Sequence, residues 1–335
     1  MKTFGIRKYG KEQRLVEIEV AVPVIKNDEV LVAVHAASIN QLDVKVMHGE
    51  FKMFLPYQFP LILGYDVAGI VSQVGSGVRG FKVGDEVFAR ASNPGGLATF
   101  IAVREADLAL KPANVTMEEA ASFPLVALTV WQAFTEKAVL KKGQKVFIQA
   151  GSGGVGTVAI QIAKHLGATV ATTTSSSNAD FVKRLGADIV IDYKTQDFEN
   201  ILKDFDLVLN SQDSKTLAKS FRILKSGGQV VSISGPPDAN FASELGLSWL
   251  MRQIISWISR KASRQAKVHN VGYSFLFMRP SGKQLAEIGR LIERGIIKPT
   301  IDKVFQFDQA ADAMTYIQSG HAKGKVVVTD IGGKS

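Results

Sequence analysis

A glycine-rich segment, KVFIQAGSGGVGT at residues 145–157, constrains this chain more than any other feature. Its β-branched and aromatic start predicts a buried parallel strand, which is covered on both faces and therefore needs no polar alternation. Gly151, Gly153 and Gly156 follow with the spacing G-x-G-x-x-G, and apolar residues recur after them at mostly helical intervals. A strand, a glycine turn and a helix in this order predict a dinucleotide-binding site.

Each glycine has its own role in such a turn. Gly151 allows the tight turn from strand to helix, Gly153 leaves room where a pyrophosphate approaches the backbone, and Gly156 lets the helix pack close to the strand. The helix N-terminus offers unpaired N–H groups and the positive end of its dipole to the phosphates. A purely structural glycine turn is the alternative. The loop residues assigned to the cofactor are Gly151, Ser152, Gly153, Gly154, Val155 and Gly156.

Length and composition limit the class of protein. The chain has 335 residues, 46% of them hydrophobic, which is enough for two domains of ordinary size with full cores. It has no cysteine, so disulfides and thiolate–metal sites are excluded. The N-terminus lacks a signal-peptide pattern, and the most apolar helical stretch, 245–258, is too short to span a bilayer. We expect a cytoplasmic protein with no membrane partner.

The net charge of +9 raises the question of a nucleic-acid partner. The basic residues are mostly scattered, and they cluster only in the run RKASRQAK at 260–267. Such a run is typical of a solvated helix face, and attraction for an anionic cofactor or partner is the alternative. We expect no nucleic-acid partner.

Two patterns divide the chain. Residues 1–120 show no alternation of strands and helices, and their short strand-like runs predict an antiparallel β domain with one short helix at 41–47. The expected strands of this part are 14–20, 29–38, 68–74, 86–89 and 98–103. From Thr116, a plausible N-cap with Glu119 three residues later, the pattern becomes helical.

Strands then alternate with helices, which predicts a parallel sheet with right-handed crossovers. The expected strands are 145–149, 169–174, 188–191, 205–209, 229–234 and 272–277. A helix at 128–137 leads into the first of them. The tail is expected to form a helix at 283–294, a strand at 300–307, a helix at 309–319 and a strand at 325–329.

Several motifs in this order resemble the medium-chain dehydrogenase/reductase superfamily, and specifically its zinc-free quinone oxidoreductase and alkenal reductase branch. They are NQLD (40–43), GYDVAG (64–69), VGSG (74–77), FKVGDEV (81–87), AGSGGVG (150–156), LGAD (185–188), IDY (191–193) and GKVVV (324–328). The resemblance implies an α/β protein: a GroES-like, β-rich catalytic domain at 1–121 and 278–335, and a Rossmann domain with a doubly wound parallel sheet at 122–277. It also implies a site in the cleft between the domains and a homodimer with a contact near 271–277.

Zinc-containing members of the superfamily place a cysteine at the position of Asn40 and a His–Glu pair at Tyr65 and Asp66. A further ligand would fall near Leu125, which is apolar. The structural-zinc lobe is also missing, because residues 91–98 run straight on, and none of the five histidines has a ligand spacing. We therefore expect no zinc.

Without a Lewis acid, alcohol oxidation is hard to support. A quinone or an α,β-unsaturated carbonyl compound accepts hydride readily when it is held close and aligned, so such a small molecule is the expected substrate. The remaining need is a hydrogen-bond donor to the developing oxyanion. Asn40 is the first candidate and Tyr65 the second, while Tyr57 is expected at the mouth of the site. A turn or cap amide is the alternative for Asn40, and simple packing is the alternative for Tyr57.

The second strand of the expected Rossmann domain ends in TTTSSSN at 172–178, with no acid before Asp180. An NAD site usually has an acid there, so NADPH is the expected cofactor and NADH the alternative. Ser175 and Ser176 would bond the 2′-phosphate, although NADP-using relatives often carry Lys or Arg where this chain has Ser177 or Asn178. From the resemblance, the remaining cofactor positions are Thr129, Tyr193, Ser234, Gly235, Phe275, Phe277 and Lys325. The two phenylalanines could equally belong to the core.

Two other functions stay open. Enoyl-thioester reductases resemble this chain but carry a proton-donating tyrosine where it has Phe51, so an acyl-CoA reductase is one alternative. A non-catalytic protein that binds NADPH, and binds RNA through the basic run, is the other.

Overall fold

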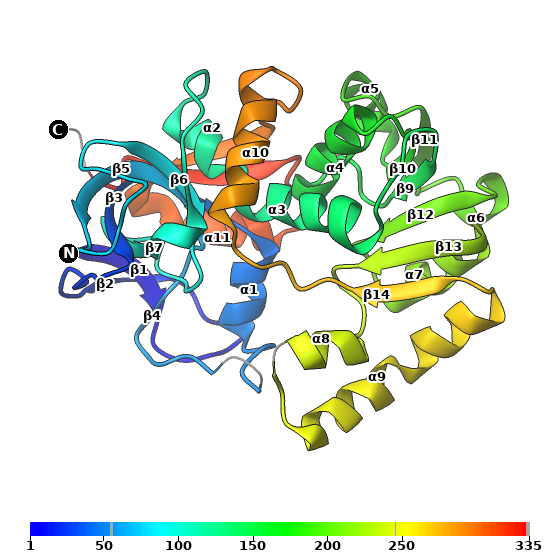
Figure 1. Ribbon diagram of the computed structural model, residues 1–335, viewed down its shortest axis with the longest axis horizontal. Coiled ribbons are helices and arrows are strands. Elements are labelled where there is room, and N and C mark those ends of the chain that lie inside the picture. Colours follow the sequence, from blue (N-terminus) through cyan, green and yellow to red (C-terminus); the bar gives the residue numbers. More distant parts are fainter. Residues whose placement is uncertain (54–55, 245, 333–335) are drawn as a thin grey trace. The chain divides into compact units, whose positions relative to one another are not determined.

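The computed structural model describes residues 1–53, 56–244 and 246–332, which fall into two compact units (Figure 1). Unit 1 consists of Met1–Leu128 and Arg279–Ser335, and unit 2 of Thr129–Met278. Unit 2 is thus one continuous segment, whereas unit 1 is assembled from the two ends of the chain. The chain passes between the units within helix α3 (Pro124–Gln132) and again after Met278.

Unit 1 is built around a seven-stranded mixed sheet. Its strands run in the order β15-β16-β3-β5-β6-β8, and β7 pairs with β3 beside that path. The strands are β3 (Glu29–Ile39), β5 (Asp66–Val74), β6 (Glu86–Arg90), β7 (Phe100–Arg104), β8 (Leu108–Leu110), β15 (Ile301–Gln306) and β16 (Lys325–Thr329). A smaller antiparallel sheet has the order β2-β1-β4, with β1 (Lys2–Ile6), β2 (Val16–Glu19) and β4 (Leu61–Ile62).

The expectation of an antiparallel β domain at residues 1–120 is confirmed, because the described strands of that part pair only antiparallel. The one parallel pair of the large sheet lies in the tail. Strands β15 and β16 are parallel, while the other pairings of the large sheet are antiparallel. Helix α11 (Ala310–Gln318) lies between these two strands in the sequence and supplies the crossover that a parallel pair needs. The sequence reasoning treated the tail strand by strand and so did not predict their pairing.

Four further helical segments belong wholly to unit 1 or begin in it. They are α1 (Gln41–His48), α2 (Met117–Ala121), α3, and α10 (Gly282–Glu293), with 3-10 turns at Glu105–Asp107 and Phe307–Gln309. The capping box predicted at the start of α2 is confirmed: Thr116 Oγ1 accepts from Glu119 N at 3.2 Å, and Glu119 Oε2 accepts from Thr116 N at 2.9 Å. Buried aliphatic side chains of the sheets, α1 and α11 form the core of this unit.

Unit 2 is an all-parallel sheet in the order β11-β10-β9-β12-β13-β14. Its strands are β9 (Lys145–Ile148), β10 (Thr169–Thr174), β11 (Ile189–Asp192), β12 (Phe205–Asn210), β13 (Leu224–Ser232) and β14 (Gly272–Phe275). Numbered along the chain this order is 3-2-1-4-5-6, which is the order of doubly wound dinucleotide-binding domains, with its switch point beside the first strand. The predicted doubly wound sheet is confirmed.

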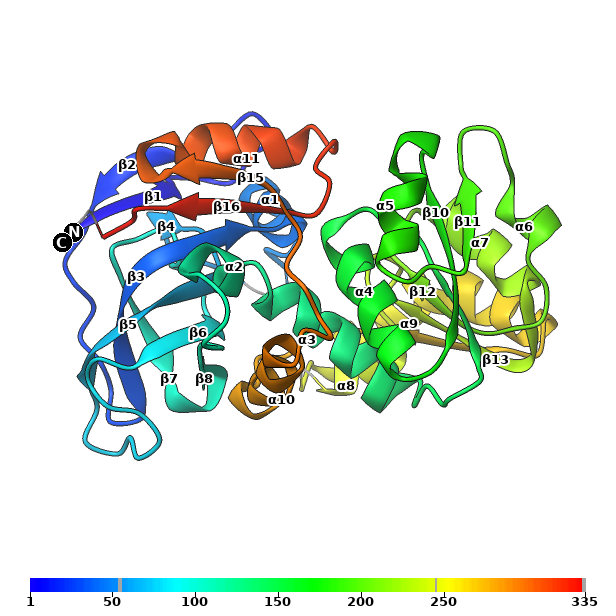
Figure 2. The ribbon, with the colours of Figure 1, turned by 90° about the horizontal axis from the view of Figure 1, so that it is seen from above.

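Helices cover both faces of this sheet, with α4 and α5 along one face and α7 along the other (Figure 2). They are α4 (Gly154–His165), α5 (Ala179–Arg184), α6 (Phe198–Ile201), α7 (Ser214–Arg222), α8 (Ala239–Glu244) and α9 (Trp249–Val268). A π-helical turn at Ala133–Lys137 extends α3, so the helix expected at 128–137 begins earlier, at Pro124. A proline suits the first turn of a helix, where its missing N–H has no partner to lose.

The long helix of unit 2 differs from its prediction. An apolar helix was expected at 245–258, but Leu245 lies outside the described residues and α9 begins at Trp249, after the N-cap Ser248. It continues to Val268 and so includes the whole basic run, which is rich in good helix formers. Among the described residues, no helix is both long and apolar enough to cross a membrane.

Candidate functional site

The glycine loop of unit 2 connects β9 to α4 at the carboxyl end of the first strand. Gly151 N donates to Thr173 O at 2.9 Å, and Gly153 N donates to Ala150 O at 3.0 Å. Gly153 is the N-cap of α4 and brings no side chain to cap it. Because the first amides of a helix have no intrahelical acceptors, those of α4 are left for an anion, which the helix dipole also favours.

The space around each glycine of the loop supports different roles for them. A Cβ on Gly151 would lie 2.2 Å from Thr172 Oγ1, and one on Gly156 would lie 2.3 Å from Ala150 O. A Cβ on Gly153 would meet only Ala150 O, at 3.3 Å. Gly151 and Gly156 are therefore required by the packing of strand and helix, whereas Gly153 is not. The loop thus fits a dinucleotide, with Gly153 leaving its outer side open to the pyrophosphate.

A second set of hydroxyl groups follows β10. Thr174 Oγ1 donates to Ser152 Oγ at 2.9 Å, and Asn178 Nδ2 donates to Ser175 Oγ at 3.2 Å. Asn178 Nδ2 also lies 3.5 Å from Ser152 Oγ, so the structure brings Ser152 of the glycine loop together with Ser175. Ser176 is exposed beside them. This cluster supplies neutral hydrogen-bond donors next to the loop.

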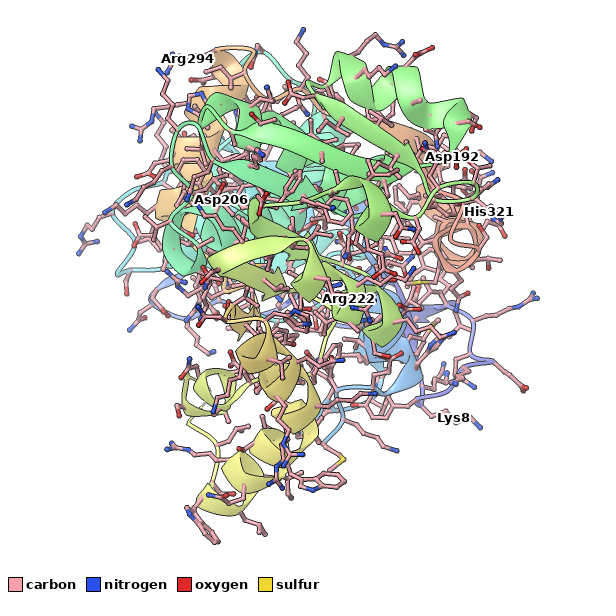
Figure 3. The ribbon with its side chains drawn as sticks, turned by 90° about the vertical axis from the view of Figure 1, so that its right-hand side faces the viewer. Lys8, Asp192, Asp206, Arg222, Arg294 and His321 are labelled. Carbon is pink, nitrogen blue, oxygen red and sulfur yellow. The ribbon has the colours of Figure 1, made fainter. Side chains whose placement is uncertain are left out.

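The sequence reasoning missed an acid at this point. Asp192 Oδ2 accepts from Ser176 N at 3.2 Å, and its Oδ1 accepts from Lys194 N at 3.0 Å. Asp192, which is labelled in Figure 3, ends β11 and pairs in register with Thr174. It therefore lies at the same end of the sheet as the serines. The sequence prediction considered an acid only at the end of the second strand. The motif IDY at the end of the adjacent third strand contains this acid, and Tyr193 of the same motif is exposed.

The other predicted cofactor residues of unit 2 fall into two groups. Ser234 Oγ donates to Gln212 O at 2.7 Å and Gly235 N donates to Ser232 Oγ at 2.8 Å, which fixes the loop after β13. Phe275 and Phe277 both pack against Phe241, with ring centroids 5.3 and 5.6 Å away. Their aromatic packing favours the alternative that they belong to the core. Thr129 lies on α3 and is buried.

Unit 1 contains a buried polar cluster centred on Lys325, at the start of β16. Its ammonium is in short hydrogen-bond contact with Asn40 Oδ1, and it lies 3.7 Å from Asp66 Oδ2. Asp66 Oδ2 also accepts from Asn40 Nδ2 at 3.0 Å and from Ser38 Oγ at 3.1 Å, while its Oδ1 accepts from Leu125 N at 2.9 Å. Asp66 therefore joins four segments of the unit.

Asn40 is held from every side in this cluster. Its side-chain oxygen faces Lys325, and its amide nitrogen donates to Asp66 and, at 3.5 Å, to Ser38 O. Its backbone N donates to Asp43 Oδ2 at 2.8 Å, since Asn40 is the N-cap of α1. Asp43 Oδ1 accepts from Gly64 N at 2.9 Å. The Asn40 amide thus uses its donors within the unit.

Burial controls the ionisation of this cluster. It raises the pKa of the Asp43 carboxyl from its ordinary 3.8 to about 6, against the opposing effect of the two backbone N–H groups. Burial also raises the pKa of Asp66, which the Lys325 ammonium opposes. Burial lowers the pKa of Lys325, and the two carboxylates oppose that shift.

Tyr65 and Tyr57 form a hydroxyl pair in the same unit. Their Oη atoms are 2.7 Å apart, and either hydroxyl can be the donor. Tyr65 is buried, with the Arg90 guanidinium 4.6 Å from its ring centroid, and burial raises its pKa so that it stays protonated. Tyr57 is half-buried. Because two hydroxyls share only one bond, one O–H of the pair remains to donate to an outside acceptor.

Comparisons with known proteins cover the whole chain. Residues 26–113 match the family described as the alcohol dehydrogenase GroES-like domain, and residues 185–328 match the one described as zinc-binding dehydrogenase. The 2-methylene-furan-3-one reductase of Solanum lycopersicum is 36% identical, over 99% of this chain and 79% of its own length. The chain belongs to the medium-chain dehydrogenase/reductase superfamily.

Other similar proteins place it in the quinone oxidoreductase and alkenal reductase branch of that superfamily. The chloroplastic NADPH-dependent alkenal/one oxidoreductase of Arabidopsis thaliana is 34% identical, over 99% of this chain and 80% of its own. The structure of the quinone oxidoreductase from Coxiella burnetii superposes with a TM-score of 0.83 at 29% identity, covering 98% of this chain and 99% of that one. The resemblance read from the sequence motifs is confirmed.

The superfamily positions that hold zinc ligands elsewhere carry Asn40, Tyr65 and Asp66 here. Lys325 places a positive charge against Asn40 and Asp66. Throughout the described parts of the chain, no three His, Cys, Asp or Glu side chains gather as a metal site. The expectation of a zinc-independent protein stays a prediction.

The sequence did not predict the contact of Arg90 with Tyr65, because no sequence motif marked Arg90 as its partner.

The two kinds of glycine in the loop can be told apart by substitution. We expect Gly156→Ala to lower the melting temperature by several degrees, since its methyl group would collide with Ala150 O and overpacking costs about 1–3 kcal/mol. Gly153→Ala should keep the wild-type melting temperature but weaken NADPH binding on the order of tenfold or more, because the methyl group takes the space of the pyrophosphate. Thermal unfolding and NADPH titration measure both. Wild-type affinity in Gly153→Ala would contradict this assignment.

The Asp43 carboxyl should make stability depend on pH. Its pKa is higher in the folded state than the ordinary 3.8, so its favourable contribution is fully present below about pH 4 and is lost as the pH rises to about 6. We expect the wild type's advantage in urea midpoint over Asp43→Asn to shrink across this window. An advantage that grows with pH would show that the folded pKa is lowered instead.

Proposed function

We propose that this protein is an NADPH-dependent oxidoreductase that transfers hydride to a quinone or an α,β-unsaturated carbonyl compound. The observation that carries the proposal is the similarity, along 99% of the chain, to reductases named for enone substrates. The glycine loop supports the cofactor assignment, because a Cβ on Gly153, unlike one on Gly151 or Gly156, would not collide with the packed strand and helix.

When bound, NADPH supplies the hydride. In this proposal the amides at the start of α4 bind its pyrophosphate, and Ser152, Ser175 and Ser176 donate hydrogen bonds to the adenosine phosphate. The Asp192 carboxylate next to Ser176 opposes the extra negative charge of a 2′-phosphate. We therefore propose that the serine donors give a preference for NADPH and that Asp192 weakens this preference enough for measurable use of NADH.

The substrate needs a donor at its carbonyl or quinone oxygen, where negative charge develops as hydride reaches the conjugated carbon. We assign this role to the Tyr57–Tyr65 pair. Tyr65 donates to Tyr57 Oη, and Tyr57 directs its own proton to the substrate oxygen. Asn40 is a positioning residue, because its amide is already engaged by Lys325 and Asp66. The α-carbon of an enolate then takes its proton from solvent.

We further propose a zinc-independent, cytoplasmic homodimer. Strand β14 is the outer strand of the unit 2 sheet, and an unpaired strand edge can bind a second copy of itself. The Arabidopsis thaliana relative is chloroplastic, so the location of this protein requires its own measurement.

The test is a steady-state assay of the purified chain with NADPH or NADH and a panel of quinones, enones and enoyl-CoA thioesters. We expect turnover of quinones or enones, a lower KM for NADPH than for NADH, and unchanged rates after dialysis against a zinc chelator. A protein that binds NADPH and reduces none of these acceptors would overturn the proposal. A strong preference for enoyl-CoA would support the thioester reductase alternative instead.

The tyrosine pair predicts a specific kinetic effect. Tyr57→Phe should lower kcat for an enone about 10–100-fold with little change in the KM for NADPH, because it removes a donor that acts on the developing oxyanion. The matched control is Tyr316→Phe, which removes another hydrogen-bonded tyrosine hydroxyl of unit 1, 2.7 Å from Asp302 Oδ2. If Tyr57→Phe keeps its full kcat, the donor is a different group.

A further inference from the structure

Helix α9 carries large apolar side chains on its outward side. Trp249 and Trp257 are each 73% exposed, and three aliphatic neighbours are exposed to between 38% and 62%. The aliphatic residues are Leu250, Ile254 and Ile258. Soluble surfaces rarely gather so many large apolar groups on one element, and such patches mark interaction sites. We call these five residues the apolar face of α9.

The opposite side of α9 packs against the rest of unit 2. Ile255, Ser259, Ala262 and Ala266 are buried and recur at intervals of four, three and four residues, so they form one helical stripe. The helix contacts α7, α8 and β14, and Figure 1 shows it running past α8 towards β14. The apolar face is therefore not required for packing within unit 2.

The charge of α9 is one-sided. Its 20 residues include five Lys or Arg and no Asp or Glu. All five are exposed, and four of them follow the apolar face, namely Arg260, Lys261, Arg264 and Lys267. Lys261 and Arg264 come four and seven residues after Trp257, so they lie on the same side of the helix. The outward side is thus apolar in its first half and cationic in its second half.

We propose that α9 binds the protein to the surface of an anionic lipid bilayer. Tryptophan side chains prefer the boundary between headgroups and acyl chains, where the aliphatic residues of the apolar face would also be buried. The basic residues would lie against anionic headgroups. The binding is peripheral, since no helix of the described residues can cross a membrane. This replaces the sequence-based expectation of no membrane partner.

Two other occupants fit the helix less well. A second copy bound symmetrically through this face would cover the apolar residues but would offer no acid of α9 to the exposed cations of either helix. A nucleic acid would use the cations and could stack on the tryptophans, but it offers nothing to Leu250, Ile254 and Ile258. An anionic bilayer satisfies both halves of the helix.

Tryptophan fluorescence gives a direct reading of this contact. The chain has three tryptophans, so Trp131→Phe leaves only the two on α9. We expect this variant of the full chain to sediment with phosphatidylcholine vesicles that contain phosphatidylglycerol and not with pure phosphatidylcholine vesicles. On the anionic vesicles its emission should shift to shorter wavelength and become protected from acrylamide. Added salt should weaken the binding.

Two sets of substitutions test the two halves separately. Trp249→Ala with Trp257→Ala, and the fourfold change of Arg260, Lys261, Arg264 and Lys267 to Gln, should each lower vesicle affinity on the order of tenfold or more. The matched control changes four exposed basic residues elsewhere to Gln, namely Lys8, Lys52, Lys183 and Arg294, and should keep nearly full affinity. Unchanged melting temperature and NADPH binding show that each variant is folded.

Three results would overturn the inference. The first is no sedimentation of the unmodified chain with anionic vesicles. The second is that the unmodified chain does not bind vesicles while the double tryptophan variant has a lower mass in solution than the unmodified chain. That result would assign the apolar face to a second copy. The third is salt-sensitive binding to single-stranded RNA in place of vesicles, lost in the fourfold variant.

Discussion

The arrangement of unit 1 depends on the contact of the buried Lys325 ammonium group with Asn40 and Asp66. It draws β16 against the start of α1 through Asn40 and against the start of β5 through Asp66, which in turn accepts from the backbone of α3 at Leu125. Burying a charge costs much free energy unless partners surround it, so these segments must keep their register for the cluster to exist. The pairing of Val326 with Ile39 in the neighbouring strands maintains the same register.

This cluster also changes the chemistry of positions that hold metal ligands in other members of the superfamily. Here the positive charge belongs to a side chain, and Asn40 and Asp66 enclose it. Because Asn40 and Asp66 already engage this ammonium, we assign the contact with a substrate oxygen to a group nearer the surface. In our proposal the hydroxyl pair of Tyr57 and Tyr65 is such a group, since its two O–H groups share one hydrogen bond.

Features that depend on local sequence pattern were predicted from the sequence. Contacts that depend on which strands are neighbours were predicted less well. The glycine loop, the parallel sheet and the capping box at Thr116 follow from spacing and periodicity, and all are present. The contact of Asp192 with Ser176 required knowing which strands lie side by side, and the roles of Asp43 and Arg90 required knowing what is buried. For α9, the apolar stretch and the basic run were read separately, because hydrophobicity alone does not show which side of a helix faces the core.

The discontinuity of unit 1 affects how the protein can form during translation. Residues 1–128 leave the ribosome before unit 2, but the strand that carries Lys325 emerges only after unit 2. Until then Asp66 and Asn40 lack their cation, and residues 36–39 of β3 lack the neighbour that β16 provides, while β7 already pairs with residues 29–33. Unit 2 is continuous and can fold as soon as it is synthesised. The nascent N-terminal segment must therefore wait, with a partly open sheet edge, for the segment after unit 2 to complete it.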